Sequence, residues 1–163
     1  GGFAMKFIAP TMEYDDAIQA FRKEYLADGG SMDGSTHLRK SDNTREWLNQ
    51  LEPDTSTFIY LKEDCTMVGI IEIRHIFNKY LELYGGHIGY CVRPSERKKG
   101  YASQMLALAL KECSRLKIKD VLITCLKDNE ASRRTIVKNG GIFESTVFEP
   151  ESEIYIDRYW IHL

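Results

Sequence analysis

A run of positive side chains stands directly before a glycine, between an extended run and a helical pattern. Arg97, Lys98 and Lys99 precede Gly100. The first N–H groups of a helix have no partner inside the helix and point outward at the positive end of its dipole. Because glycine lets another group approach the backbone closely, such a turn can seat a phosphate or pyrophosphate. A solvated basic turn and a nucleic-acid contact are the alternatives that these residues leave open.

Charge and composition narrow the classes of protein that fit. The 163 residues suit one domain, and 43% hydrophobic with 28% charged residues is ordinary for a globular protein. A net charge of -2 argues against a general nucleic-acid binder, and the two glycine-rich nucleotide motifs G-x-x-x-x-G-K-[ST] and G-x-G-x-x-G are absent. No apolar run approaches the ~20 residues that span a bilayer, and no signal peptide is recognised. We therefore expect a cytoplasmic protein that binds neither nucleic acid nor membrane.

The cysteines and histidines do not suggest a metal site. No C-x-x-C pair occurs, and no histidine stands at ligand spacing beside a cysteine. Three of the four cysteines fall in apolar segments, which favours reduced thiols that pack in the core. No metal is expected. The residues considered are Cys65, Cys91, Cys113, Cys125, His37, His75, His87 and His162.

Periodic patterns predict an α/β chain with a mixed sheet. Apolar residues at three- and four-residue steps, such as Ile18, Phe21 and Tyr25, indicate helices, and short alternating or continuous apolar runs indicate strands. The central strand–helix–strand–helix piece implies parallel pairing, with a ligand crevice at the carboxyl ends of those strands. We expect strands at 6–10, 57–63, 66–76, 86–92, 120–126, 142–148 and 153–161, and helices at 11–28, 41–51, 101–116 and 130–139.

Helix caps and loops follow from the same patterns. Thr11 is expected to cap the first helix, and Ser41 or Asp42 the second. The stretch 29–37 is expected to be a flexible loop, and 78–86 is a connector of unassigned structure. Residues 1–4 are interpreted as a cloning remnant before Met5, so that 5–163 is expected to form a single domain.

The basic turn also resembles a known motif. The run "ERKKGYA" after "GYCVRP" resembles the pyrophosphate loop of the GNAT superfamily of N-acetyltransferases, Q/R-x-x-G-x-G/A, with Arg97, Gly100 and Ala102 in the three defined places. Downstream, Asn129 and Gly140 match that family's second cofactor segment. The resemblance runs from Thr57 to the C-terminus, and "GGHIGYCVRPSERKKGYA" is similar to a group of uncharacterised bacterial members.

The resemblance implies a fold and a cofactor seat. It implies a GNAT-like fold with a mixed central sheet of about six to seven strands flanked by about four helices, whose parallel strands 86–92 and 120–126 splay into a V. Acetyl-CoA, the acyl donor, is implied in that V. Its pantetheine arm would meet backbone groups of strand 86–92 and its pyrophosphate the basic loop. The implied cofactor residues are Tyr90, Cys91, Val92, Arg97, Lys98, Lys99, Gly100, Tyr101, Ala102, Ser103, Asn129 and Ser132. For Asn129 a plain helix cap, and for the strand residues plain packing, are the alternatives.

The chain departs from the family at the acid and the base. The usual tyrosine acid matches Ile136 and the usual glutamate base matches Gly86, and neither can transfer a proton. Glu72 and His87 are the hypothetical replacements for the base, and Tyr90 is the first hypothesis for the acid, with Tyr155 and Tyr159 behind it. The alternatives are a solvated sheet face for Glu72, a structural or substrate-side role for His87, and packing for the tyrosines.

The expected function is therefore acetyl transfer from acetyl-CoA to a primary amine of a small molecule or peptide, directly within a ternary complex. A non-catalytic acyl-CoA-binding sensor is the alternative, because both usual proton-transfer groups are missing. Acidic residues at the end of the first helix and beyond it can attract a cationic acceptor, and a solvated loop is the simpler alternative. Strands expected near the C-terminus leave a homodimer open. The acidic residues are Asp28, Asp33, Asp42 and Glu46.

Overall fold

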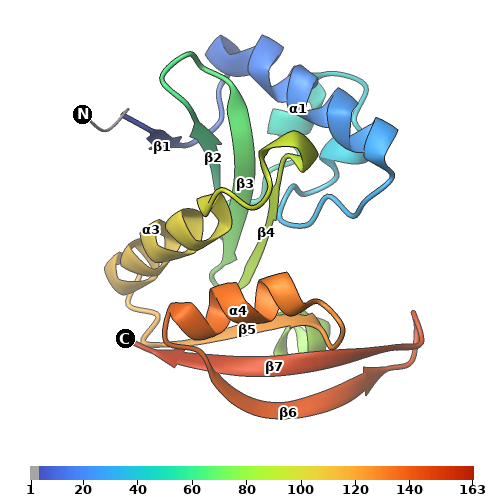
Figure 1. Ribbon diagram of the computed structural model, residues 1–163, viewed down its shortest axis with the longest axis vertical. Helices are drawn as coiled ribbons and strands as arrows, with labels where there is room; N and C mark the ends of the chain where they lie inside the picture. The colour runs from blue at the N-terminus through green and yellow to red at the C-terminus, as the bar shows by residue number, and fades with distance from the viewer. Residues whose placement is uncertain (1–3) are drawn as a thin grey trace.

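The computed structural model describes residues 4–163, which build one seven-stranded sheet in the order β1-β2-β3-β4-β5-β7-β6 (Figure 1). The first three residues of the expected cloning remnant lie outside the described part. The strands are β1 (Lys6–Ile8), β2 (Thr55–Leu61), β3 (Met67–Arg74), β4 (Ile88–Val92), β5 (Asp120–Leu126), β6 (Ile142–Glu149) and β7 (Ile154–His162). The helices are α1 (Asp15–Asp28), α2 (Thr44–Asn49), α3 (Tyr101–Arg115) and α4 (Glu130–Lys138).

The predicted fold class is confirmed. The sheet is mixed: β4 and β5 are parallel, and every other neighbouring pair is antiparallel. Each expected helix and strand is present in the expected order, and the connector left unassigned contains one turn of π-helix, Leu81–Gly85.

The two parallel strands separate almost as soon as they meet. β4 pairs with β5 only at Ile88 and Ile123, whereas β3 pairs with β4 at five register positions and β5 with β7 at seven. In Figure 1, β2, β3 and β4 run together and β5 and β7 run at a wide angle to them, with α4 beside β5. The sheet therefore opens into a V between β4 and β5, as the family resemblance implied.

Two apolar cores cover the two faces of the sheet. α3 and α4 contribute Met105, Leu106 and Ile136 to one core, and α1 with the segment around α2 contributes Phe21 and Trp47 to the other. All seven of the residues from Met67 to Ile73 are consequently buried, although their side chains alternate between the faces. Burial on both faces makes β3 a rigid support for β4.

The caps expected at Thr11 for the first helix and at Ser41 or Asp42 for the second are wrong. Thr11 precedes a short 3-10 turn without a side-chain capping bond, and α2 begins after Asn43, whose side chain accepts from the Glu46 N–H at 2.8 Å. Ser41 is instead buried and donates to the His37 carbonyl at 2.9 Å. Asparagine is as good a cap as serine or aspartate, so the three consecutive residues could not be ranked by type.

The stretch 29–37 is held by hydrogen bonds at several points. Ser35 donates its hydroxyl to the Met32 carbonyl at 2.6 Å, the buried Trp47 indole donates to the Ser35 carbonyl at 2.6 Å, and Arg39 donates to the Gly30 carbonyl. The loop expected to be flexible is thus tied to itself and to α2.

No helix among residues 4–163 has the length and apolar character of a membrane span.

Candidate functional site

A cleft of about 1060 Å³ occupies the V. β4, β5, the loop before α3, the first turns of α3 and the inner side of α4 form its walls. Eleven of the twelve expected cofactor residues line it. Lys99 is the exception, and its ammonium group pairs with Glu96 at 2.9 Å. The eleven are Tyr90, Cys91, Val92, Arg97, Lys98, Gly100, Tyr101, Ala102, Ser103, Asn129 and Ser132.

The loop before α3 presents a row of free backbone donors. None of the N–H groups from Arg97 to Ser103 donates a hydrogen bond to another group within residues 4–163, and Gln104 N–H is the first of the helix to find a carbonyl, that of Gly100. Lys98 and Gly100 adopt φ values of 64° and 85°, and a Cβ on Gly100 would meet nothing closer than 3.9 Å. Free donors at the positive end of a 15-residue helix suit a phosphate oxygen.

The backbone of β4 also offers groups to the V. Arg74 N–H donates to the His87 carbonyl and Arg93 N–H to the Val68 carbonyl, each at 2.7 Å. Since antiparallel pairing alternates every second residue, Gly89 and Cys91 direct their backbone groups to β3. The backbone groups of Tyr90 and Val92 therefore face the V, where β5 has moved away.

Tyr90 joins the two sides of the cleft. Its hydroxyl lies 2.7 Å from the Ser132 hydroxyl on α4. Burial raises the pKa of Tyr90 to about 12, so the phenol stays protonated at neutral pH and can donate a hydrogen bond. A phenol of that pKa is less acidic than an ordinary thiol, at about 8.5, and is better suited to donating a hydrogen bond than to giving up its proton.

The last turns of α1 hold the end of β4 and the basic loop. Tyr25, 2% exposed, donates its hydroxyl to the Val92 carbonyl at 2.7 Å, and the Arg97 guanidinium lies 5.7 Å from the centre of its ring. The preceding residue, Glu24, accepts through its carboxylate from Arg93 at 2.9 Å and from the Ser95 N–H at 2.8 Å. These contacts fix the path of the chain from β4 into the loop.

Asn129 caps α4 and also lines the cleft. Its side-chain oxygen accepts from the Ser132 N–H at 3.1 Å, which is the capping role that the sequence left as an alternative. The amide NH₂ group is not used by that bond. Both of the roles considered for Asn129 are thus compatible with its position.

Two of the three expected catalytic residues do not line the cleft. Glu72 is 6% exposed and accepts from the Arg74 guanidinium at 3.0 Å and from the Thr36 hydroxyl, so it is buried and paired rather than solvated. His87 is 8% exposed, accepts from the Leu122 N–H at Nδ1 at 2.9 Å and packs against Phe77. Burial, with a smaller effect of Arg74, lowers its pKa to about 4.

The departures from the family motif have structural reasons. Gly86 has φ 71°, and a Cβ there would lie 2.6 Å from the Leu122 carbonyl oxygen, so a glutamate does not fit. Ile136 is fully buried in the core under α3 and α4. Tyr155 and Tyr159 do not line the cleft. Tyr90 is therefore the one expected catalytic residue in the cleft.

Sequence reasoning missed several residues of the cleft wall. Arg134 and Lys138 stand four residues apart on α4 and face the same cleft as the basic loop, a spacing that could have signalled a second cationic contact. Asp33 and Arg74 also line the cleft. Asp33 was one of four acidic residues that the sequence could not rank, because only the path of its loop brings it there.

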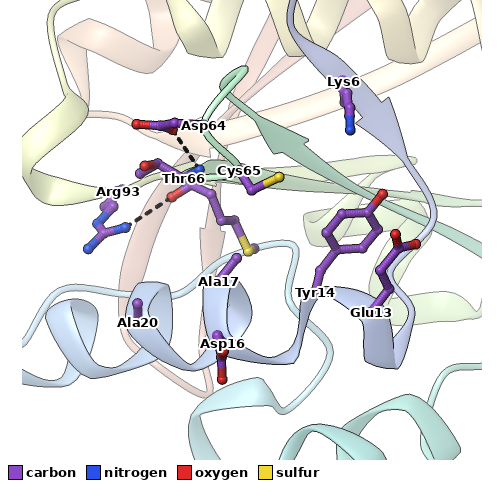
Figure 2. A pocket seen from close by; sticks show the side chains of 11 residues that line it. Lys6, Glu13, Tyr14, Asp16, Ala17, Ala20, Asp64, Cys65, Thr66 and Arg93 are labelled. Carbon is purple, nitrogen blue, oxygen red and sulfur yellow. Dashed lines mark hydrogen bonds between the residues drawn. The ribbon is translucent and has the colours of Figure 1, made fainter.

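A second hollow of about 600 Å³ lies between α1, β1 and the β2–β3 turn (Figure 2). Figure 2 shows Tyr14, Cys65 and Arg93 around it, with a hydrogen bond from the Thr66 N–H to Asp64. No expected site residue lines this hollow. Nor do the residues from 4 to 163 include a group of three or more His, Cys, Asp or Glu side chains arranged for a metal.

Comparison with known proteins decides the family. The profile of the acetyltransferase (GNAT) domain matches residues 7–142, most of the chain. The chain belongs to the GNAT acetyltransferase family. Over an alignment of 84 residues, the chain is 34% identical to the SPbeta prophage-derived uncharacterized N-acetyltransferase YokL of Bacillus subtilis (strain 168). That alignment covers 50% of this chain and 45% of the relative, so the match spans less than half of YokL.

Solved GNAT structures share the whole fold at low sequence identity. The ribosomal L7/L12 alpha-N-protein acetyltransferase RimL, in complex with coenzyme A, superposes with a TM-score of 0.77 at 15% identity over 99% of this chain and 96% of its own. The ribosomal-protein-S5-alanine acetyltransferase of Vibrio fischeri superposes with a TM-score of 0.76 at 10% identity, over 99% of this chain and 95% of its own. A variant of the spermidine N-acetyltransferase SpeG of Vibrio cholerae superposes with a TM-score of 0.70 at 13% identity, over 96% of this chain and 94% of its own.

Proposed function

We propose that this GNAT domain, residues 5–163, is an N-acetyltransferase that carries an acetyl group from acetyl-CoA to a primary amine. The observation that carries the proposal is the row of seven free N–H groups from Arg97 to Ser103 at the mouth of the V. Their orientation at the start of α3 suits a pyrophosphate, and the RimL structure contains coenzyme A in a protein of the same fold.

The residues present fit the proposed donor along its length. The loop N–H groups would hold the pyrophosphate, with the side chains of Arg97 and Lys98 supplying positive charge. The backbone groups of Tyr90 and the N–H of Val92, whose carbonyl already accepts from the Tyr25 hydroxyl, would pair with the pantetheine arm, as a strand would. Asn129 would present its free amide NH₂ group, and Ser132 its hydroxyl, from the other side.

The chemistry divides between the donor and the protein. Acetyl-CoA supplies a thioester, an acyl group already activated for transfer. A backbone N–H of β4 would polarise the carbonyl and stabilise the charge that develops on its oxygen, a contribution often worth a few kcal/mol. Tyr90, which stays protonated because burial raises its pKa to about 12, would donate a hydrogen bond to the leaving sulfur.

Thermal unfolding with acetyl-CoA tests the donor site directly. A ligand at a hundredfold excess over its Kd adds about 2.7 kcal/mol to the free energy of unfolding. For a chain of this size that corresponds to a rise in Tm of roughly 5–10 °C, at about 2–4 °C per kcal/mol. We expect this rise with acetyl-CoA, and no rise with ATP or NADH.

Gly100→Val is the informative variant, because a branched side chain at φ 85° would project beside the free donors. Gly140→Val is its matched control: Gly140 has φ 95°, has similar open space and does not line the cleft. Both variants lose stability from backbone strain, but we expect only Gly100→Val to lose the response to acetyl-CoA. An unchanged response in Gly100→Val would remove the proposed pyrophosphate seat.

A non-catalytic acyl-CoA-binding sensor is the second candidate. The positions of Glu72 and His87 outside the cleft, together with Gly86 and Ile136 at the usual base and acid positions, support it. Release of the CoA thiol in the presence of a broad panel of amines distinguishes the two. Binding of acetyl-CoA without turnover of any amine would favour the sensor.

A further inference from the structure

The loop between α1 and α2 lies against β4 at a pair of glycines. A Cβ on Gly34, at φ 77°, would overlap the Gly89 carbonyl, and a Cβ on Gly89 would come within 3.3 Å of the Gly34 nitrogen. This backbone-to-backbone contact fixes the loop across the middle of β4. It places Asp33, the residue before Gly34, on the wall of the cleft.

Asp33 is the cleft carboxylate without a cationic partner. Two carboxylates line the cleft, Asp33 and Glu96. Glu96 is neutralised by Lys62 at 2.7 Å and Lys99 at 2.9 Å. No Lys, Arg or His side chain within residues 4–163 forms an ion pair with Asp33, and its one hydrogen bond there comes from the Ser31 hydroxyl to Oδ1 at 2.6 Å. Oδ2 is left to meet a ligand.

The other carboxylates nearby are already engaged. Glu72 is buried and paired with Arg74 at 3.0 Å, and Asp28 lies 3.6 Å from the Arg97 guanidinium. Of the four acidic residues that the sequence singled out as possible contacts for a cationic acceptor, Asp33 is the one that lines the cleft. Asp33 is also exposed, so a dissolved amine can reach it.

The charge of Asp33 acts on the part of β4 that faces the proposed thioester. Burial is the main reason why the pKa values of Tyr90 and Cys91 rise to about 12, and the Asp33 carboxylate raises both further. Its influence on these two side chains agrees with the Gly34–Gly89 contact, which sets the loop beside the same strand. The rest of the cleft wall carries cations, notably Arg97, Arg134 and Lys138.

We infer that Asp33 is the acceptor site of the enzyme: it binds an alkylammonium group beside Tyr90 and takes a proton from it. This inference rests on the proposed function. An alkylammonium has a pKa near 10.4 and cannot attack until it loses a proton. One ammonium proton passes to Asp33, directly or through a water molecule. The amine nitrogen then forms the C–N bond with the acetyl carbon as the C–S bond breaks, the second nitrogen proton ends on sulfur, and Asp33 releases its proton to solvent.

The test compares Asp33→Asn with wild type on charged and uncharged amines. The acceptors are a panel of primary alkylamines, including 1,4-diaminobutane and glycinamide, and aniline, which is uncharged at pH 7. Since general base catalysis contributes roughly 10²–10⁴-fold, we expect Asp33→Asn to lower kcat/KM for alkylamines by about 100-fold or more while aniline changes little. For alkylamines the variant's kcat/KM should also rise tenfold per pH unit above neutrality, because only the free amine reacts, whereas the wild-type profile stays flatter.

Asp42→Asn is the control, since Asp42 is exposed, carries the same charge and does not line the cleft. The rise in Tm with acetyl-CoA is measured for all three proteins. If all three proteins show the same rise in Tm with acetyl-CoA and Asp33→Asn still acetylates alkylamines at the wild-type rate, the inference is overturned and the proposed function stands. Wild type that binds acetyl-CoA but acetylates no alkylamine would also overturn it. Wild type without any rise in Tm would remove the proposed function itself.

Discussion

At the scale of single residues, His87 shows how burial converts an apparent catalytic group into a structural one. Its Nδ1 accepts from the Leu122 N–H, its ring packs on Phe77, and Arg74 disfavours its protonated form. A histidine with a pKa of about 4 is uncharged at neutral pH. Its contact with Leu122 joins the chain just before β4 to β5, beside the point where the two strands pair. Its chemistry should therefore appear in the stability of the fold rather than in the rate of transfer.

Stability should fall as the pH drops from about 6.5 to about 4. The folded state keeps His87 neutral down to about pH 4, whereas the unfolded chain binds a proton at its ordinary pKa near 6.5. Because the unfolded state binds more protons in that window, the free energy of unfolding rises with pH there, by on the order of 1–3 kcal/mol in all. The measurement is the midpoint of urea unfolding at pH values between 4.5 and 7.5, above the range in which the titration of carboxylates dominates the pH dependence of stability.

His87→Asn isolates this effect. An asparagine oxygen can accept from the Leu122 N–H in the place of Nδ1 but does not titrate, so the variant should show a flatter dependence on pH, although it loses stability at pH 7 with the ring packing. His37→Asn, at an exposed position whose imidazole forms no ion pair within residues 4–163, should keep the wild-type slope. An unchanged slope in His87→Asn would mean that another group controls the acid limb.

At the scale of elements, α1 acts as a clamp on the cofactor loop. Tyr25 and Glu24 hold the Val92 carbonyl and the Ser95 N–H, so the end of α1 sets where the free donors lie. Tyr25→Phe removes one hydroxyl and leaves the ring in place. We expect stability to fall by about 1 kcal/mol and the KM for acetyl-CoA to rise several-fold, with a smaller change in kcat.

Tyr60→Phe is the matched control, because Tyr60 is also buried and donates to Gln104 at 2.7 Å without lining the cleft. It should lose a similar amount of stability, measured by urea unfolding, and keep its KM for acetyl-CoA. Equal effects of the two substitutions on KM would show that Tyr25 supports the fold in general rather than the loop in particular.

The order of the elements and the basic loop could be predicted from sequence, whereas the neighbours of particular side chains could not. Alternation correctly set Glu72 opposite Ile71 and Ile73, but both faces of β3 are covered, so facing away from them does not mean facing solvent. Asp33 could not be separated from the other acidic residues, because its place depends on the contact between Gly34 and Gly89. Such contacts join segments far apart in the chain and leave no local pattern.

At the scale of the whole molecule, charge is separated rather than abundant. The chain has a net charge of -2, yet the cleft is lined by four cationic side chains, Arg97 and Lys98 from the loop before α3 and Arg134 and Lys138 from α4. A local positive field of this kind attracts an anionic ligand without making the protein a general polyanion binder. The salt dependence of binding therefore distinguishes the proposed donor site from a nucleic-acid site.

We expect the Kd for acetyl-CoA to weaken several-fold between 50 mM and 500 mM NaCl, measured by isothermal titration calorimetry. Side-chain charges a few ångströms from the phosphates are screened as the Debye length shrinks to about 4 Å, whereas direct bonds from the loop N–H groups are screened less. Replacing Arg134 and Lys138 together with glutamine should reduce this salt dependence, and replacing the exposed Lys111 and Lys117 with glutamine should leave it unchanged. Tight binding of a single-stranded oligonucleotide with a steep salt slope would contradict this view, because it would show that the basic loop serves a phosphate backbone instead.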